Sequence, residues 1–235
     1  MHDGIVLEKV TLTLGSTRFD FDCRIEGSAV TAIAGPSGAG KSTLLNLIAG
    51  FEQPKSGRIF IAETEQTANH PSERPVSVVF QDHNLFAHLD IFTNVALGIS
   101  PSMRLAPKDK DRVEEAMARV GLAGFGQRMP GSLSGGEKQR AAFARALVRE
   151  KPILLLDEPF ASLDADLRIQ MSDLLLDLHR ETGNTVVMIT HDREEIARVA
   201  DRVLLIERGH VASNDPTAAY FSRFGLAVQD PAGTV

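Results

Sequence analysis

The segment GPSGAGKST, residues 35–43, limits the possible folds of this chain more than any other feature. It follows an apolar run, Val30–Ala34, that is typical of a buried strand, and it precedes a helical pattern that ends at Gly50. Its glycines let backbone N–H groups turn inward without obstruction by Cβ atoms, and the positive end of the following helix points to the same place. The segment therefore predicts a loop that cradles phosphate groups between a strand and a helix.

Two side chains of this loop carry the expected chemistry. The ammonium group of Lys41 should reach the β- and γ-phosphates of a nucleotide, and the hydroxyl group of Ser42 should bind Mg²⁺. The residues of the loop that we expect to bind the nucleotide are Gly35, Pro36, Ser37, Gly38, Ala39, Gly40, Lys41, Ser42 and Thr43.

A second apolar run, Ile153–Leu156, ends in two adjacent carboxylates, Asp157 and Glu158. In open parallel sheets, ligands lie beyond the carboxyl ends of the strands, so we expect both acids near the phosphates. Asp157 is predicted to hold Mg²⁺ or its waters. Glu158 is predicted to orient or deprotonate the attacking water.

Further apolar runs show no alternation, which predicts strands of a parallel sheet that helices cover on both faces. These runs are Val76–Phe80, Val186–Ile189 and Val203–Ile206, and we expect the last strand to end near Ile206. The first 25 residues or so alternate more, as antiparallel strands at an edge do.

Helix signals separate these runs, and residues from about 85 to 149 contain no clear strand. We therefore predict a helical lobe inserted between strands of the sheet. The helix signals are Pro107 before a pattern that Gly121 stops, a capping box of Ser134 and Glu137 before a helix to about Glu150, an amphipathic stretch from Asp164 to Gly183, and a second capping pattern of Asp192 and Glu195.

Charge and cysteine content narrow the function classes. The net charge of −6 does not favour non-specific nucleic-acid binding, so we expect no nucleic-acid partner. Cys23 is the single cysteine, which excludes an intrachain disulfide. The N-terminus has no signal-peptide pattern, and no apolar run approaches the ~20 residues needed to cross a bilayer. If the chain works at a membrane, another chain should supply the spanning helices.

The segment Leu133-Ser134-Gly135-Gly136-Glu137 resembles the LSGGQ signature of ATP-binding-cassette (ABC) ATPases. The order of motifs over residues 35–191 is similar as well: the phosphate loop, Gln81, the signature, the acidic pair, Ser162-Leu163-Asp164, and His191. The resemblance implies an α/β fold of the P-loop NTPase (RecA-like) class. This fold has a parallel-sheet core, an N-terminal antiparallel β edge and an inserted α-helical lobe.

The resemblance also implies a division of the chain, read as one ABC ATPase domain over residues 1–235. We expect residues 1–84 and 150–212 to form the core with its β edge, and residues from about 85 to 149 to form the helical lobe. Residues 213–235 are expected to form an irregular or helical C-terminal tail.

Roles for single residues follow from the same resemblance. ATP is the implied nucleotide, Gln81 the implied contact to Mg²⁺, and Asp164 the aspartate of the D-loop. His191 matches the switch histidine, which is expected to hydrogen-bond the γ-phosphate and to help position Glu158. In this family two cassettes pair head to tail, so Ser134, Gly135, Gly136 and Glu137 are expected to complete the site of a second copy in a homodimer.

One departure from the family concerns the adenine base. The family usually stacks an aromatic side chain on adenine, but the spacing before the phosphate loop places Leu14 there. Phe19 is the nearest aromatic residue. Either adenine rests on the aliphatic Leu14, or Phe19 swings in to contact it.

Within the family, the chain resembles the ATPase subunits of bacterial importers, most of all those that serve uptake of thiamine or thiamine diphosphate. The segments that carry this likeness are residues 35–57, PSERPVS at 71–77, NLFAHL at 84–89 and LVREKP at 147–152. Residues 85–88 would line a groove that receives a helix of the permease, or Leu85 and Phe86 would belong to the core instead. The implied partners are transmembrane permease subunits and a periplasmic solute-binding protein, at the cytoplasmic face of the inner membrane.

Other functions stay open at this point. Importer ATPases for polyamine, iron, sulfate or molybdate share the same motifs. A soluble ABC ATPase that acts on DNA or ribosomes is a second class, although long coiled-coil insertions and a tandem cassette are missing from the sequence. A GTPase or nucleotide kinase would share the phosphate loop, but neither resembles the signature segment, and no Asn-Lys-x-Asp motif occurs.

Overall fold

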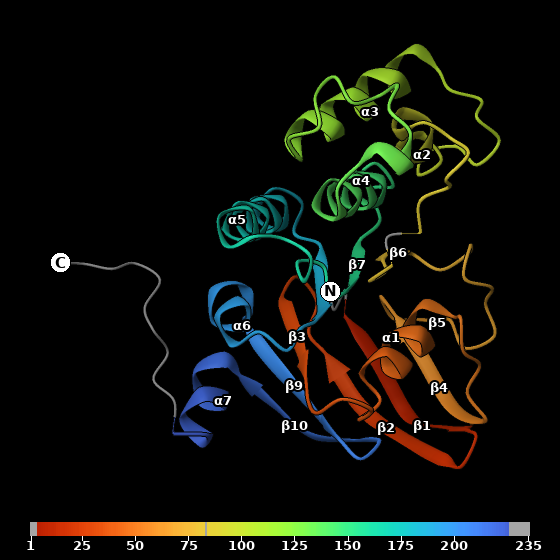
Figure 1. The fold of residues 1–235 in the computed structure, drawn as a ribbon. Coiled ribbons are helices and arrows are strands. Elements are labelled where there is room, and N and C mark those ends of the chain that lie inside the picture. The colour runs from red at the N-terminus through yellow and green to blue at the C-terminus, as the bar shows by residue number, and fades with distance from the viewer. Residues whose placement is uncertain (1–3, 83, 226–235) are drawn as a thin grey trace.

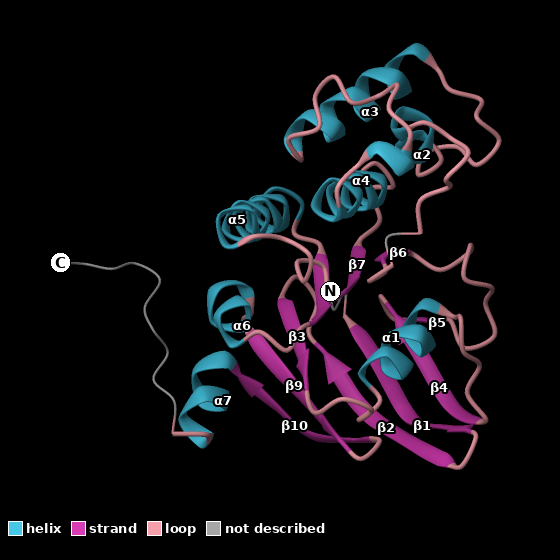
Figure 2. Cartoon of the chain, viewed as in Figure 1, coloured by secondary structure: helices cyan, strands magenta, loops and turns pink. Residues whose placement is uncertain are grey.

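Residues 4–82 and 84–225 are described by this computed structural model, and within them ten strands form one sheet with helices on both sides (Figures 1 and 2). The strands are β1 (Ile5–Leu14), β2 (Thr17–Ile25), β3 (Val30–Ala34), β4 (Ser56–Ile61), β5 (Thr64–Glu65), β6 (Val76–Val79), β7 (Ile153–Asp157), β8 (Thr185–Ile189), β9 (Arg202–Glu207) and β10 (His210–Pro216). The helices are α1 (Lys41–Ala49), α2 (Ile91–Ala96), α3 (Pro107–Arg119), the 3-10 turn η1 (Pro130–Ser132), α4 (Gly135–Leu147), α5 (Ala165–Thr182), α6 (Arg193–Val199) and α7 (Thr217–Arg223). The strand order is β5-β4-β1-β2-β10-β9-β3-β8-β7-β6.

The strands β9, β3, β8, β7 and β6 run parallel to one another. Side chains of β7 alternate between two cores: Leu154 and Leu156 pack in the cluster with α2–α5, and Ile153 and Leu155 pack in the cluster with α1. The prediction of a parallel sheet buried on both faces is confirmed. Because the carboxyl ends of parallel strands share one edge, the loops after β3, β6, β7 and β8 all begin at that edge.

The antiparallel strands lie beyond β9. β1 pairs with β2 and β4, as the alternating sequence predicts, and α1 packs between these strands and the parallel ones. The expectation that the last strand ends near Ile206 is wrong, and so is the start of a tail at residue 213. β10 pairs with β9 over His210–Pro216, and His210 also pairs with Asp20 of β2. The polar sequence HVASNDP hides this strand because it carries no apolar run.

Helix ends follow the capping signals closely. Gly50 ends α1 with φ 87°, Pro107 opens α3, and Gly183 ends α5 with φ 62°. The capping box of Ser134 and Glu137 opens α4, which ends at Leu147 rather than near residue 150. The second capping pattern differs: Asp192 caps α6, but its partner Glu195 binds another side chain, described below.

Arg74 is fully buried and holds the far end of α1. Its Nη1 donates to the carbonyl oxygens of Leu47 at 2.7 Å and Ile48 at 2.8 Å, and its other nitrogens donate to those of Asn69 and Thr67, each at 3.2 Å. These are carbonyls that a helix end and a turn otherwise leave without donors. Burial lowers the pKa of the Arg74 guanidinium.

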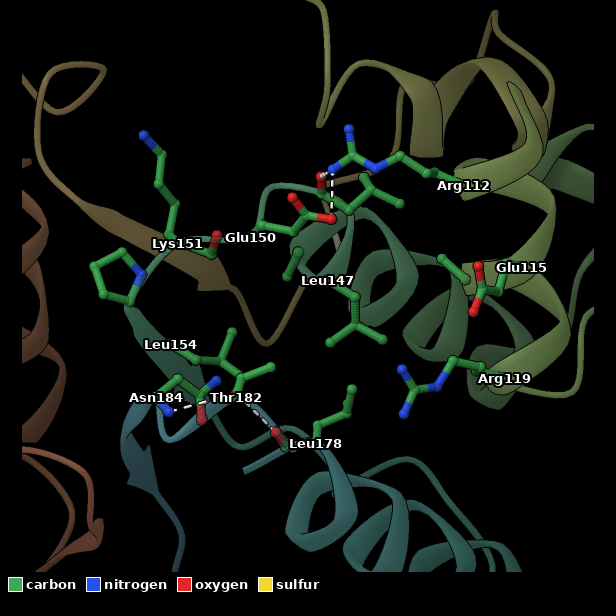
Figure 3. A pocket seen from close by; sticks show the side chains of 15 residues that line it. Arg112, Glu115, Arg119, Leu147, Glu150, Lys151, Leu154, Leu178, Thr182 and Asn184 are labelled. Carbon is green, nitrogen blue, oxygen red and sulfur yellow. Dashed lines mark hydrogen bonds and ion pairs between the residues drawn. The ribbon is translucent and has the colours of Figure 1, made fainter. Parts of the chain in front are cut away.

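Residues 85–149 form α2, α3, η1 and α4 without a strand, and Figure 1 shows this group above the sheet. A cavity of about 360 Å³ separates α3 and α4 from β7 and α5 (Figure 3). At the rim of this cavity, Arg112 of α3 forms an ion pair with Glu150 at 2.7 Å, and Arg119 forms one with Glu181 at 2.8 Å. Two ion pairs therefore join the helical group to the elements next to the sheet.

Candidate active site

The phosphate loop connects β3 to α1 and has the backbone that its glycines predict. Gly35, Gly38 and Gly40 have φ values of 144°, 75° and 108°, a region that side chains with a Cβ rarely adopt. A Cβ at Gly35 would lie 2.1 Å from the carbonyl oxygen of Ile206, whereas nothing lies within 4 Å of a Cβ built at Gly38. The loop is thus packed at its base and open at its middle, which fits a phosphate group.

The two polar side chains of the loop contact the base of the loop and the end of β7. Lys41 Nζ donates to the carbonyl oxygens of Gly35 at 2.9 Å and Pro36 at 3.0 Å, so its charge lies over the loop. The Ser42 hydroxyl group lies close enough to the carboxyl group of Asp157 to affect its pKa, which brings the start of α1 next to the end of β7. Burial raises the pKa of Asp157, and the charge of Glu158 adds to this, while Ser42 and Lys41 act in the opposite direction.

A hydroxyl and a carboxylate side by side are oxygen ligands of the type that Mg²⁺ prefers. Mg²⁺ usually takes only one or two protein ligands and completes its shell with phosphate and water. Ser42 and Asp157 therefore fit this ion, although the described residues contain no cluster of three or more His, Cys, Asp or Glu side chains that could hold a metal alone.

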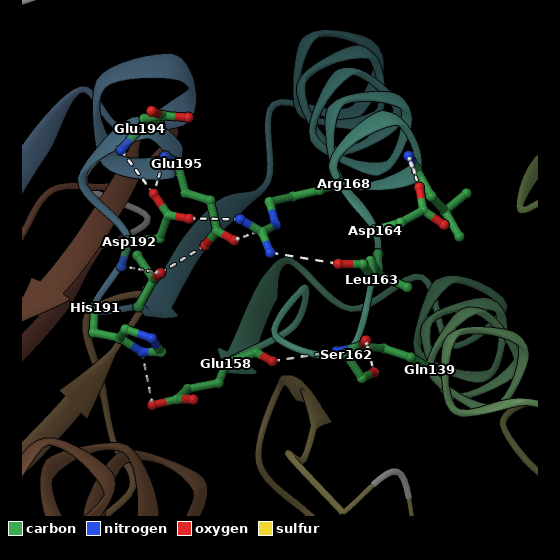
Figure 4. A network of polar contacts seen from close by, with 12 residues as sticks. Gln139, Glu158, Ser162, Leu163, Asp164, Arg168, His191, Asp192, Glu194 and Glu195 are labelled. Atoms are coloured by element: carbon green, nitrogen blue, oxygen red, sulfur yellow. Dashed lines mark hydrogen bonds and ion pairs between the residues drawn. The ribbon is translucent and has the colours of Figure 1, made fainter.

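Glu158 stands at a strained turn directly after β7. Its φ of 48° is uncommon for a residue with a side chain. Two contacts hold this backbone: the N–H group of Glu158 donates to the carbonyl oxygen of Ile189 at 3.0 Å, and Gln139 Nε2 donates to the carbonyl oxygen of Glu158 at 3.2 Å. The Glu158 carboxylate then lies 3.4 Å from Nδ1 of His191 (Figure 4). The predicted pair of Glu158 and His191 is brought together.

The signature segment forms the start of α4, and its capping box is complete. Ser134 N–H donates to Glu137 Oε2 at 2.7 Å, and Glu137 N–H donates to Ser134 Oγ at 3.3 Å. The hydrogen bond that the Glu137 carboxylate accepts from the Ser134 N–H group, together with the Ser134 side chain, lowers the pKa of Glu137. A Cβ at Gly136 would meet Leu163 at 3.1 Å, so within its own chain the signature adjoins the segment Ser162–Asp164 rather than the phosphate loop.

Three predicted residues lie at the margin of this site. Gln81 is exposed, two residues after β6, at the edge where the other loops begin. Leu14 is exposed at the end of β1, and Asp164 caps α5 by accepting from Leu167 N–H at 2.9 Å. The ring of Phe19 is buried and comes within 2.7 Å of a Cβ built at Gly40, whereas Leu14 is exposed.

Two residues of the site were missed by the sequence reasoning. Gln139 is buried on α4 and accepts a hydrogen bond from Ser162 Oγ while it donates to Glu158. Arg168 on α5 donates to Asp192 Oδ2 at 2.7 Å, next to His191. A single Gln or Arg in a helix usually reads as a surface residue. Their closeness to the motifs at 134–137 and 162–164 was the only signal in the sequence.

Comparison with known proteins identifies the family. Residues 19–161 match the profile of the ABC transporter family. The chain is 51% identical over 224 residues to the thiamine import ATP-binding protein ThiQ of Rhizobium meliloti (strain 1021), covering 95% of this chain and 94% of that protein. The chain belongs to the ABC transporter family. This ABC ATPase is also 46% identical over 208 residues to the thiamine import ATP-binding protein ThiQ of Haemophilus influenzae (strain 86-028NP), covering 88% and 97% of the two chains.

Solved ABC cassettes have the same fold. The dimeric, post-hydrolysis structure of the ATP-binding cassette MJ0796 bound to ADP and Pi superposes with a TM-score of 0.82 at 30% identity, covering 91% of this chain and 98% of that one. The structure of cbiO1 from Clostridium perfringens, part of the ABC transporter complex cbiONQ, gives 0.83 at 29% identity, covering 95% and 92%. The predicted P-loop NTPase fold and ATPase activity are confirmed.

None of the helices within residues 4–82 and 84–225 has the length and apolar character that crossing a membrane requires.

Proposed function

We propose that this ABC ATPase powers the import of thiamine or thiamine diphosphate through a separate permease at the cytoplasmic face of the bacterial inner membrane. The similarity to thiamine import ATP-binding proteins, at 46–51% identity over most of the chain, is the observation that carries the proposal. A periplasmic solute-binding protein would deliver the solute to the permease.

Each predicted site residue has a role in the proposed hydrolysis. The loop from Gly35 to Thr43 holds the phosphates through its N–H groups, and Lys41 neutralises charge on the β- and γ-phosphates. Ser42, Asp157 and Gln81 would hold Mg²⁺, which offsets charge that develops on the phosphoryl oxygens.

Glu158 and His191 lie 3.4 Å from each other. Glu158 would accept the proton of the attacking water, and His191 would orient that carboxylate and donate to the γ-phosphate. The hydrogen bond from Gln139 to the Glu158 carbonyl oxygen holds the backbone from which this carboxylate extends.

The signature residues Ser134, Gly135, Gly136 and Glu137 would complete the ATP site of a second copy. Ser134 and Gly135 are exposed, and the first N–H groups of α4 form an anion site. The dimeric state of the MJ0796 cassette supports such a pairing. Asp164 would stand at the interface, because its neighbours Ser162 and Leu163 adjoin the signature within the chain.

A groove of about 580 Å³ offers a place for the permease. Phe51 and Phe86 both line it and are 50% and 48% exposed, so two large apolar side chains share one surface groove. The backbone next to Phe86 is fixed, because buried Asn94 accepts from Phe86 N–H at 2.7 Å and donates to its carbonyl oxygen at 3.1 Å. Leu85, by contrast, packs against the core. We propose that an apolar permease helix contacts the two phenylalanines.

The proposed domain division follows the same scheme. Residues 85–149 would move as a lobe against the core of residues 1–84 and 150–216, and the ion pairs Arg112–Glu150 and Arg119–Glu181 would limit that movement. Movement of the lobe would carry the signature toward or away from the partner's phosphate loop.

Uptake of radiolabelled thiamine by the native host tests the solute directly. Deletion of the gene should abolish uptake at nanomolar thiamine, and the wild-type chain, but not Glu158→Gln, should restore it. Uptake of polyamine, iron, sulfate and molybdate should stay unchanged. Loss of one of these instead of thiamine would reassign the solute, while normal uptake of all five would contradict the importer function.

Docking to the permease is tested by co-purification. Phe86→Asp should reduce recovery with the permease, because it places a charge in an apolar contact. Phe224→Asp is the matched control, since Phe224 is also exposed, at 46%, but lies after α7, away from the groove. Equal recovery of both variants would contradict the assignment of the groove.

A further inference from the structure

His191 lies between two residues that belong to a closed ring of polar contacts. Thr190 Oγ1 donates to Glu195 Oε2 at 2.6 Å, and Asp192 N–H donates to Thr190 Oγ1 at 3.0 Å. Arg168 closes the ring from α5: its Nη1 donates to Asp192 Oδ2 at 2.7 Å, and its Nε lies 3.6 Å from Glu195 Oε1. The two neighbours of His191 are therefore linked to one guanidinium group, Asp192 directly and Thr190 through Glu195 (Figure 4).

The same guanidinium group reaches the D-loop. Arg168 Nη2 donates to the carbonyl oxygen of Leu163 at 3.4 Å, and Arg168 lies one turn after Asp164, the cap of α5. Leu163 and its neighbour Ser162 are the residues nearest to the signature glycines. Arg168 thus connects the segment Ser162–Asp164 with the loop that carries His191.

The side chains that form this connection are buried or half-buried. The side chains of Glu195, Asp192 and Arg168 are 6%, 25% and 33% exposed. They line, with Glu158 and His191, a polar cavity of about 60 Å³. A planar guanidinium spreads five donors over three nitrogens and can serve two carboxylates and a carbonyl that lie on different sides, whereas lysine concentrates its three donors on one atom.

We propose that Arg168 is a positioning residue for ATP hydrolysis. It holds the loop of His191 in place next to Glu158, and it couples the position of this loop to that of the segment Ser162–Asp164. The inference rests on the roles proposed above for Glu158 and His191. His191 itself is 70% exposed and 3.4 Å from Glu158, so its own side chain is weakly anchored. Without Arg168 the loop can shift, and a displacement of about 1 Å in an active site lowers the rate about 100-fold.

Two matched substitutions in the full chain separate positioning from general stabilisation. Arg168→Gln removes the bridge beside His191. Arg198→Gln removes a 2.6 Å ion pair to Asp173 that joins the same two helices, α5 and α6, farther along the chain. Arg168→Gln should lower kcat about 10- to 100-fold with the Kd for ATP changed less than about twofold. Arg198→Gln should change neither quantity more than about twofold.

A double-mutant cycle with His191→Ala tests whether Arg168 acts through the histidine. Arg168→Gln should lower kcat less than about twofold further when His191 is already Ala. A full, multiplicative loss in that background would overturn the proposal, as would an unchanged kcat of Arg168→Gln alone. If His191→Ala alone hydrolyses ATP normally, the role of His191 is wrong, and Arg168 cannot act through it.

Arg168→Lys is a further variant that keeps the test valid if Arg168→Gln fails to fold. Lysine keeps the charge opposite Asp192 and Glu195 but loses the simultaneous contact to Leu163. We expect a thermal midpoint close to that of the wild type and a kcat between those of the wild type and Arg168→Gln. Wild-type kcat in a folded Arg168→Lys chain would show that charge alone suffices and would overturn the bridging role.

Discussion

Gln139 of α4 donates its side-chain amide to the carbonyl oxygen of Glu158, 3.2 Å away, and accepts from Ser162 Oγ with its other end. One buried amide therefore joins the helix of the signature, the turn of the proposed catalytic base and the D-loop. The signature would serve the site of a partner copy, while Glu158 serves its own. Gln139 is thus placed to couple the position of Glu158 in its own site to the position of the signature, which would serve the partner's site.

Replacing Gln139 by leucine should affect hydrolysis more than ATP binding. The change leaves the half-buried Glu158 carbonyl without this donor, which costs about 1–3 kcal/mol, and it removes the acceptor of the exposed Ser162 hydroxyl. We expect kcat to fall about tenfold or more, with the Kd for ATP nearly unchanged. Ser162→Ala, which removes one of the two bonds, should lie between. A proportional loss of ATP binding would contradict this role.

The positions of the motifs could be predicted because each follows an apolar strand. Val30–Ala34 and Ile153–Leu156 carry enough hydrophobic residues to be read as buried strands, and parallel neighbours place their ends at one edge. β10 could not be found in this way, because its polar residues His210–Pro216 are recruited to the sheet by pairing with β9. Register between distant strands is a tertiary property that no local pattern contains.

The polar contacts that hold the motif residues in place could not be predicted from the sequence either. The spacing of Asp192 and Glu195 suggested a capping box, yet Glu195 turns inward to Thr190 and Arg168. Because Glu195 turns inward, burial raises the pKa of its carboxyl group. Arg168 of α5, which lies more than twenty positions away in the chain, is the partner that turns Glu195 inward, and no local pattern predicts its approach.

Arg74 should be among the most sensitive residues of the fold. Arg74→Met leaves four carbonyl oxygens without donors, two of them at the end of the phosphate-loop helix, and should lower the free energy of unfolding by about 3 kcal/mol. Arg58→Met is the control, because Arg58 forms an exposed ion pair with Glu8 and should cost less than about 1 kcal/mol. Urea unfolding measures both, and similar values would contradict the account of Arg74.

Cys23 should be inert to alkylation in the folded chain. Burial, with a smaller contribution from the charge of Asp22, raises the pKa of the Cys23 thiol to about 12. The pKa of an unfolded thiol is about 8.5, so the folded state favours the protonated form, and this contribution to stability is lost as the pH rises from about 8.5 through 12. Iodoacetamide at pH 8.5 should label the chain in urea but not the native protein. Rapid labelling of the native protein would refute this environment.

Leu14 should make base recognition weak. An aliphatic side chain offers adenine and guanine similar contacts, so the Kd values for ATP and GTP should agree within about tenfold. Leu14→Tyr should tighten binding of both nucleotides by about tenfold, since stacking of a base on an aromatic ring contributes about 1–3 kcal/mol. Binding of inorganic tripolyphosphate should not change. A strong preference of the wild type for ATP would point to a contact with the base elsewhere.

ATP hydrolysis by Glu158→Gln tests the central claim most directly. A general base contributes about 100- to 10,000-fold, so kcat should fall by at least about 100-fold, while ATP still binds and drives the chain into a dimer on size-exclusion chromatography. Glu194→Gln, at an exposed carboxylate in the first turn of α6, should hydrolyse ATP at the wild-type rate. Hydrolysis by Glu158→Gln at the wild-type rate would contradict the proposed site.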